Sequence, residues 1–152
     1  MHNQVEPDEE FNNVIRKEIN NNGAVVVSSG SEESHYLYTV GNNSCQLPEI
    51  LLFCDIQKNP YNIRMLQNMC RFMLDTGAMP TPHKELVFQK KHYYPIVVDS
   101  VFIYLYCETA KNYYGSESSV SMIQLIESDR YGKFPHQPGY TKSLRPKYLK
   151  VN

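Results

Sequence analysis

The pattern of apolar and polar positions is most regular in the second quarter of the chain, where it predicts two strands joined by a turn. Residues 35–40 alternate ring-bearing and aliphatic side chains, as a half-buried strand does. Residues 50–54 form a continuous apolar run, which is typical of a more deeply buried strand. Gly41 and Asn42 supply the positive φ that a turn between the strands needs. We therefore expect the two strands to fold back on each other near the centre of one sheet.

Two segments show the three- and four-residue apolar spacing of amphipathic helices. The first extends from Asp8, a natural N-cap, to about Asn22, and Gly23 follows as a C-cap. Its apolar positions are Phe11, Val14, Ile15 and Ile19. The second begins at Asn59, another natural cap, with a proline in its first turn, and it ends at Gly77. Its apolar positions are Ile63, Leu66, Met69, Cys70, Met73 and Leu74. We expect the methionines of this second helix to pack in the core.

A third helix is predicted for residues 101–114, with Asp99 or Ser100 as its cap and Gly115 at its end. Its apolar side consists of Phe102, Leu105, Tyr106 and Ala110. Because β-branched and aromatic residues fill the first half of this segment, its composition also favours a strand.

Further strands are predicted from β-branched and aromatic runs. They cover residues 24–28, 86–91, 93–98 and 119–127. The second and third of these are joined by the basic turn Lys90-Lys91-His92, and residues 129–140 form a final loop with several turn-forming residues. The sequence thus predicts an α+β protein, in which a mixed or antiparallel β-sheet is packed on one side by two or three helices.

The length of 152 residues fits a single domain with a substantial hydrophobic core. We expect a flexible N-terminus over residues 1–8, a single α+β domain over residues 9–140 and a basic C-terminal tail over residues 141–152. The sequence contains no internal repeat that would divide the domain further.

The composition narrows the classes of function. The net charge of −1 argues against binding to the phosphate backbone of nucleic acids. No apolar run approaches the ~20 residues of a membrane-spanning helix, and the N-terminus has no apolar signal core. We therefore expect a cytoplasmic protein that does not bind membranes. The 12 tyrosines suit half-exposed surfaces and pockets, because each apolar ring carries a polar tip.

The cysteines and histidines lack the spacings that hold metals or disulfides. The four cysteines stand singly, and Cys54, Cys70 and Cys107 lie on apolar faces. No two histidines have ligand spacing. The sequence also lacks a glycine-rich phosphate loop, a dinucleotide-binding motif, a Gly-x-Ser-x-Gly nucleophile elbow and a His-Glu-x-x-His zinc motif. We therefore expect no metal and no cofactor, and we favour a non-enzymatic role.

Polar residues near strand ends and in the last loop are the remaining candidates for chemistry. If the two central strands pair, Thr39 and Glu49 lie at the same edge of the sheet, where a carboxylate beside a hydroxyl could orient a ligand or act as a base. The alternative for Glu49 is that it caps a backbone N–H group or pairs with a lysine or arginine. Asp129 either accepts hydrogen bonds from N–H groups of its own turn or acts as an acid or base. Tyr114 either lines a pocket or covers the rim of the core.

Three motifs occur in an order that is shared with a known family. They are Tyr38-Thr39-Val40-Gly41 followed by Pro48-Glu49-Ile50-Leu51, then Tyr113-Tyr114-Gly115, then Ile123-Gln124-Leu125 leading into Asp129-x-x-Gly132-x-Phe134-Pro135. In these motifs the chain resembles the bacterial family known as domain of unknown function DUF4262, over about residues 10–140. It departs from the family's pattern in the polar turn after Gly41 and at His136, where the family commonly has an aromatic residue. The resemblance implies the fold and a bacterial cytoplasmic setting, but no activity.

A more distant resemblance, to suppressor-of-fused type domains, rests on the Thr-x-Gly and Pro-Glu-aliphatic pieces and implies action through protein binding, as in toxin-immunity proteins. We therefore expect a non-enzymatic protein-binding module of the immunity or accessory type, or a ligand sensor, whose partner is another protein or a second copy of the chain. The alternative is an enzyme or nucleotide-type small-molecule binder with a pocket between the Tyr-Thr-Val-Gly strand and the Asp-x-x-Gly-x-Phe-Pro loop. The candidate ligand- or partner-binding residues are His35, Tyr38, Thr39, Glu49, Tyr114, Gln124, Asp129 and His136.

Overall fold

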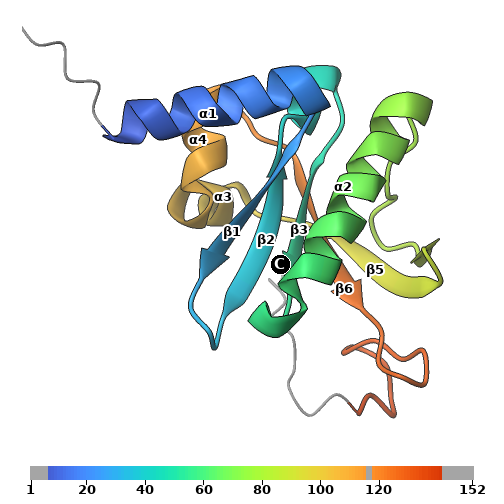
Figure 1. Ribbon diagram of the computed structural model, residues 1–152. Coiled ribbons are helices and arrows are strands. Elements are labelled where there is room, and N and C mark those ends of the chain that lie inside the picture. The colour runs from blue at the N-terminus through green and yellow to red at the C-terminus, as the bar shows by residue number, and fades with distance from the viewer. Residues whose placement is uncertain (1–6, 116–117, 142–152) are drawn as a thin grey trace, which may run out of the picture.

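The computed structural model describes residues 7–115 and 118–141 (Figure 1). Its elements are, in chain order, α1 (Pro7–Asn22), β1 (Val25–Gly30), β2 (His35–Val40), the 3₁₀ helix η1 (Asn42–Cys45), β3 (Glu49–Phe53), the 3₁₀ helix η2 (Ile56–Lys58), α2 (Asn59–Thr76), β4 (Leu86–Phe88), β5 (Lys91–Val97), α3 (Ser100–Tyr106), α4 (Glu108–Tyr114) and β6 (Met122–Glu127). The predicted α+β class is confirmed, because helices pack on one mixed sheet.

The strands form a single sheet in the order β1-β2-β3-β6-β5-β4. β2 and β3 are antiparallel, and Tyr38 pairs with Leu51. β3 and β6 are parallel, with Glu49 beside Met122, and the other neighbouring strands are antiparallel. The predicted return of the chain between residues 35 and 53 is therefore confirmed. β3 lies inside the sheet, where a continuous apolar strand is shielded from water on both of its faces.

Each face of the sheet has its own core, because side chains alternate along a strand. On one face, Tyr36 and Tyr38 pack with buried residues of α1, α3 and α4. On the other face, Leu37 packs with the buried residues of α2. The expectation that two or three helices share one side is met by α1, α3 and α4. The packing of α2 on the opposite side was not predicted, and it follows from the apolar side chains that β2 and β3 direct to both faces.

β2 was predicted to be half-buried, but all six of its residues are buried. The hydroxyl groups on this strand find partners inside the protein. The Tyr36 hydroxyl donates to the carbonyl of Tyr106 at 2.7 Å, and the Tyr38 hydroxyl accepts the backbone N–H of Thr109 at 3.2 Å. Such hydrogen bonds offset the cost of burying a hydroxyl group. The tyrosines of β2 therefore connect the sheet to α3 and α4 instead of facing water.

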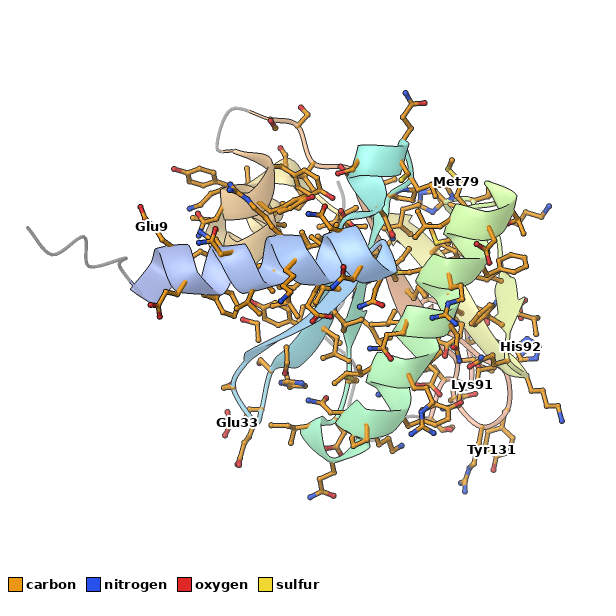
Figure 2. All side chains as sticks on the ribbon, turned by 45° about the horizontal axis from the view of Figure 1, so that its top comes forward. Glu9, Glu33, Met79, Lys91, His92 and Tyr131 are labelled. Carbon is orange, nitrogen blue, oxygen red and sulfur yellow. The ribbon has the colours of Figure 1, made fainter. Side chains whose placement is uncertain are left out.

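α1 matches the predicted helix, but only part of its predicted apolar face is buried. Ile15 and Ile19 join the core, whereas Phe11 and Val14 are 51% and 58% exposed. The half of α1 that carries Glu9 projects past β1 and beyond the edge of the sheet (Figures 1 and 2). This half of the helix therefore has no sheet beneath it.

α2 confirms the second predicted helix, and its methionines are buried as expected. Gly77 ends the helix in the left-handed conformation, with φ of 75°. The predicted cap Asn59 is instead the first residue inside the helix, with helical backbone angles. Asp55 supplies a cap four residues earlier, where its side chain accepts the N–H of Gln57 at 3.0 Å and starts η2.

The predicted third helix is two short helices, because the chain departs from helical angles at Cys107, with φ of −114° and ψ of 60°. Asp99 caps α3 as one of the two expected candidates, and its carboxylate accepts the N–H of Val101 at 2.7 Å. The buried positions are Ile103, Cys107, Thr109 and Ala110. Leu105 and Tyr106, which one continuous helical period placed on the core side, are exposed. The break rotates α3 relative to α4, so a single period does not describe both.

The remaining strands differ from their predicted bounds. β4 and β5 are joined by Gln89 and Lys90, whose φ angles of 50° and 67° are those of a tight two-residue hairpin turn. Lys91 and His92, which were predicted to belong to the turn, lie in β5 and pair with β4. β6 begins three residues later than predicted, at Met122.

The two predicted terminal segments are only partly described. α1 begins at Pro7, inside the stretch that was expected to be flexible, and residues 1–6 lie outside the described part of the chain. The proposed cap Asp8 has no described side chain. At the other end only Thr141 of the predicted basic tail is described. None of the described helices combines the length and apolarity that crossing a bilayer requires.

Substitution of Leu66 tests how much the core beneath α2 contributes to the stability of the protein. This side chain has no exposed surface. Leu66→Ala removes buried carbon atoms and leaves a cavity, so we expect the free energy of unfolding to fall by about 2–5 kcal/mol. Urea unfolding followed by circular dichroism measures this change. Gln67→Ala, at the next and exposed position of the same helix, should alter stability by less than about 0.5 kcal/mol. Equal losses in the two variants would contradict the burial of α2.

Candidate functional site

The turn between β2 and β3 encloses the carboxylate of Glu49. Glu49 is the first residue of β3, and its side chain has no exposed surface. The Thr39 hydroxyl, near the end of β2, donates to Glu49 Oε1 at 2.9 Å. The same hydroxyl accepts the backbone N–H of Ile50 at 2.8 Å, in the place of a backbone carbonyl. The predicted meeting of Thr39 and Glu49 at one edge of the sheet is therefore confirmed.

Three successive backbone N–H groups also point at this carboxylate. Those of Gly41 and Asn43 donate to Oε2 at 3.1 and 3.2 Å, and that of Asn42 donates to Oε1 at 3.1 Å. The Tyr114 hydroxyl, at the end of α4, completes the set by donating to Oε2. We call Glu49 and these five donors the Glu49 cage. N–H groups at the start of a helix lack acceptors within the helix. At the start of η1 the Glu49 carboxylate is that acceptor. Glu49 thus has the capping role that was its expected alternative.

Gly41 lets the backbone approach the carboxylate in this way. Its φ is 125°, a conformation that side chains disfavour. A Cβ atom at this position would lie 2.6 Å from the carbonyl oxygen of Gly23. The Gly41 N–H also donates to the Tyr114 hydroxyl at 2.8 Å. The glycine therefore brings the β2–β3 turn, the end of α1 and the end of α4 together at one point.

The electrostatics of the cage follow from its burial. Burial raises the pKa of Glu49, whereas the hydrogen bonds from Tyr114, the Asn43 N–H and Thr39 act in the opposite direction. Burial and the neighbouring Glu49 carboxylate both raise the pKa of Tyr114, so that its hydroxyl keeps its proton and remains a donor. Among the described residues, no lysine or arginine forms an ion pair with Glu49. N–H and O–H dipoles, not a cation, surround this carboxyl group.

Two asparagines of the turn extend the cage, and sequence reasoning missed both. The Asn42 amide nitrogen donates to the carbonyl of Pro48 at 3.1 Å and lies 3.4 Å from Cys70 Sγ in α2. The Asn43 side chain exchanges two hydrogen bonds with the backbone of Ser121, at 2.9 and 2.8 Å. These contacts tie the turn to both α2 and the start of β6. The signal was present as the polar run after Gly41, which the sequence presented only as a departure from the family pattern.

The cage leaves Glu49 no capacity to act on a ligand. An ionised carboxylate accepts hydrogen bonds at about four lone-pair sites. Five donors already occupy those sites. A general base must reach a substrate proton, and this carboxylate has no exposed surface from which to do so. The arrangement is therefore structural in the observed conformation.

Asp129 forms a second, smaller set of hydrogen bonds at the opposite end of β6. It is 5% exposed and accepts the N–H groups of Tyr131, Lys133 and Thr141 at 2.9, 2.8 and 3.0 Å. Burial acts to raise the pKa of Asp129, but the N–H groups of Lys133, Thr141 and Tyr131 lower it below its usual value. The expected turn-stabilising role of Asp129 agrees with this geometry, which closes the loop 129–141.

The structure does not bring all of the predicted site residues together. Glu49 lies beside Met122 at the start of β6, whereas Asp129 follows its end, so the six residues of β6 separate the two carboxylates by about 20 Å. His35 begins β2 at the far end of the β2–β3 pair from Glu49, and its Nε2 lies 3.3 Å from Ser28 Oγ. Glu49 and Asp129, one from each of the two motif regions, therefore lie at opposite ends of β6.

The other candidates are not among the five donors of the cage. Tyr38 and Gln124 are buried, at 2% and 1% exposure, and both are aligned with Leu51 across the face that α1, α3 and α4 cover. Burial raises the pKa of Tyr38 to about 12. His136 is in the last loop, where its ring lies 4.6 Å from that of Tyr94 in β5. Of the predicted set, Thr39, Glu49 and Tyr114 meet in the cage.

Several large apolar side chains of α3 are exposed, although the sequence predicted that part of this helix faces the core. We use the term α3 face for four residues that are 53–61% exposed. They are Val101, Tyr104, Leu105 and Tyr106. A half-open cleft of about 350 Å³ lies between α3 and residues 118–120. Val101, Tyr104 and Leu105 line it on one side, and Val120 lines it on the other.

The fold and these sites define a single α+β domain with a closed carboxylate cage and an exposed apolar helix. The chain matches the family model described as "Domain of unknown function (DUF4262)" over residues 18–141. It therefore belongs to this family, and the predicted resemblance is confirmed. The match contains every residue of the Glu49 cage. No curated protein and no solved structure matches the chain. Within the described residues, no group of histidine, cysteine and acidic side chains is arranged to hold a metal ion.

Glu49→Gln tests the cage. Glutamine keeps the size of the side chain but turns one acceptor oxygen into a donor that faces other donors. We expect the free energy of unfolding to fall by about 1.5–3 kcal/mol, which is the range for hydrogen bonds to charged groups. Chemical denaturation measures the loss. Glu108→Gln, at an exposed position in α4, provides the matched control and should be neutral within about 0.5 kcal/mol. A Glu49→Gln protein as stable as the wild type would show that the carboxylate is not needed as a cap.

The lowered pKa of Asp129 leads us to expect that the stability of the protein decreases at acidic pH. Because folding lowers the pKa of Asp129, the unfolded chain binds the proton more readily. The free energy that Asp129 contributes to folding is therefore fully present above pH 3.8, its ordinary pKa. It is lost as the pH falls through the lower pKa of Asp129 in the folded protein. Asp129→Asn should be less stable than the wild type at neutral pH and should lose less stability on acidification. Urea unfolding across a pH series measures both. Asp75→Asn, at an exposed position of α2, should keep the wild-type profile, and the hypothesis fails if Asp129→Asn also keeps it.

Proposed function

We propose that this protein is a non-enzymatic protein-binding module of the immunity or accessory type, acting in the bacterial cytoplasm, and that the α3 face contacts its partner. The observation that carries the proposal is the exposure of this face. α3 contains no charged residue, and more than half of the surface of Val101, Tyr104, Leu105 and Tyr106 is open to solvent. Grouped apolar surface of this kind marks sites of protein interaction.

The aromatic side chains of the α3 face suit a contact surface. Tyrosine is enriched at the energetically important positions of interfaces, because it buries a large ring while its hydroxyl keeps a polar partner. Lys111 of α4 lies 4.6 Å from the ring of Tyr104, which holds this ring in a defined position. The face is thus organised before any partner binds, which reduces the entropic cost of association.

The cleft and the nearby charges indicate the chemistry of the partner. Val101, Leu105 and Val120 line the cleft, so it suits an apolar group of the partner. Asp99 and Glu108 stand at the two ends of α3, and both are exposed. A partner segment that fits therefore carries an apolar side chain flanked by lysine or arginine residues. Charge complementarity of this kind favours the correct partner and its orientation.

The closed Glu49 cage supports a binding role over a catalytic one, since the protein's most buried carboxyl group has no free acceptor site. A ligand sensor is the second candidate, because the volume of the cleft lies within the range of about 300–1,000 Å³ that is typical of small-molecule pockets. The two candidates differ in what occupies the cleft, and one experiment separates them.

The test compares capture from the native cells by the wild type and by two surface variants. Leu105→Glu places a charge on the α3 face. Val87→Glu makes the same change at a position on β4 with similar exposure, 57% against 60%. We expect a protein to be captured in stoichiometric amount by the wild type and by Val87→Glu and to be lost from Leu105→Glu. Mass spectrometry identifies the captured proteins and small molecules.

Two outcomes would overturn the proposal. Equal capture of the protein by Leu105→Glu would move the contact away from the α3 face. A stoichiometric small molecule in the wild-type sample, with no captured protein, would favour the ligand sensor. Circular dichroism of Leu105→Glu verifies that the variant is folded.

A further inference from the structure

β1 forms an open edge of the sheet. It is the first strand in the spatial order, and β2 is its only neighbour among the described strands. Among the described residues, no backbone hydrogen bond joins residues 25–30 to any element other than β2. One row of N–H and C=O groups on this strand therefore has no backbone partner.

The two edges of the sheet differ in their protection against pairing with another chain. Soluble proteins guard such edges with charged residues, prolines or very short strands. The β4 edge is three residues long, with Glu85 immediately before it and Lys90 two residues after it. β1 is six residues long and begins with three valines, and residues 23–31 contain neither a charge nor a proline. The β1 edge thus carries none of these protective features.

The direction of the free groups can be worked out from the pairing of β2. The Cys54 N–H donates to the carbonyl of His35, so His35 directs its backbone groups toward β3. Backbone groups alternate in direction along a strand, so Tyr36, Tyr38 and Val40 direct theirs toward β1. Their partners in β1 are Ser29, Val27 and Val25. The outward groups of β1 consequently belong to Val26, Ser28 and Gly30.

α1 adds apolar surface at the same edge. Its Glu9 half projects past β1 in both views (Figure 2). Phe11 and Val14, in this projecting half, are 51% and 58% exposed. A strand added to β1 would continue the sheet beneath the projecting helix. An unprotected strand edge and exposed apolar side chains of α1 therefore occur together.

We infer that β1 pairs antiparallel with β1 of a second copy of this chain, which forms a symmetric dimer with one continuous sheet. The distribution of charge favours a second copy of the chain as the partner and favours antiparallel pairing. Because β1 contains no charged residue, two copies of this strand can pair without electrostatic repulsion. Glu32 and Glu33 lie in the β1–β2 loop, where Figure 2 labels Glu33. Antiparallel pairing places the two acidic loops at opposite ends of the interface, whereas parallel pairing would place them together.

The first test removes one outward N–H group. Proline at position 28 eliminates an N–H that faces the free edge and leaves the β1–β2 hydrogen bonds in place. Ser28→Ala is the matched control, because it removes the hydroxyl contacts with His35 and Asn59 but keeps the N–H. Light scattering after size exclusion should give twice the monomer mass of 17.7 kDa for the wild type and Ser28→Ala. Ser28→Pro should give the monomer mass.

The second test needs no variant. Amide hydrogen exchange by NMR should show that the N–H groups of Val26, Ser28 and Gly30 become protected as the wild-type concentration rises. Those of Val27 and Ser29, which face β2, should be protected at every concentration. This measurement decides the question even if Ser28→Pro does not fold.

A wild type that is monomeric at all concentrations would overturn the inference, as would a dimer that survives Ser28→Pro with no added protection of the outward N–H groups. The inference is independent of the α3 face. Leu105→Glu should remain dimeric, and a dimer that is lost in Leu105→Glu but kept in Ser28→Pro would assign self-association to α3 instead.

Discussion

The hydrogen bonds between the Glu49 carboxylate and the N–H groups of residues 41–43 are the constraint on which this fold depends. They fix the turn that leaves β2 and hold the first residue of β3 in place. Tyr114 extends the same contact to the end of α4, and Asn43 extends it to the start of β6. One buried carboxyl group therefore joins segments that are far apart in the sequence. A surface ion pair would contribute far less, because water competes for its partners.

The two central strands explain why helices lie on both faces of the sheet. Side chains of β2 and β3 are buried on each face, and each face therefore needs a cover. α2 provides one cover with its methionines, and α1, α3 and α4 provide the other. The tyrosine hydroxyls of β2 are satisfied by the backbone of the short helices. This arrangement uses the polar groups of the molecule for internal contacts.

The same arrangement leaves exposed apolar surface at the periphery. α3 is too short and too apolar to hide all of its side chains against the sheet, so its outer face stays open. β1 has a partner on one side only, and half of α1 extends beyond it. The buried carboxylates close turns, whereas the exposed apolar groups are available for contact.

The sequence by itself determined the α+β class, the pairing of the strands around Gly41, the extent of α2 and the family, since each depends on local periodicity, turn chemistry or ordered motifs. It also predicted that Thr39 and Glu49 lie together, because a turn between two antiparallel strands places the joined ends of the strands side by side. Only the tertiary structure decided that five donors enclose Glu49, that Cys107 divides the third helix, and that His35 and Asp129 lie far from Glu49. Those facts depend on contacts between distant segments, such as Tyr114 with Gly41, and a periodic pattern carries no information about which distant segment will supply a partner.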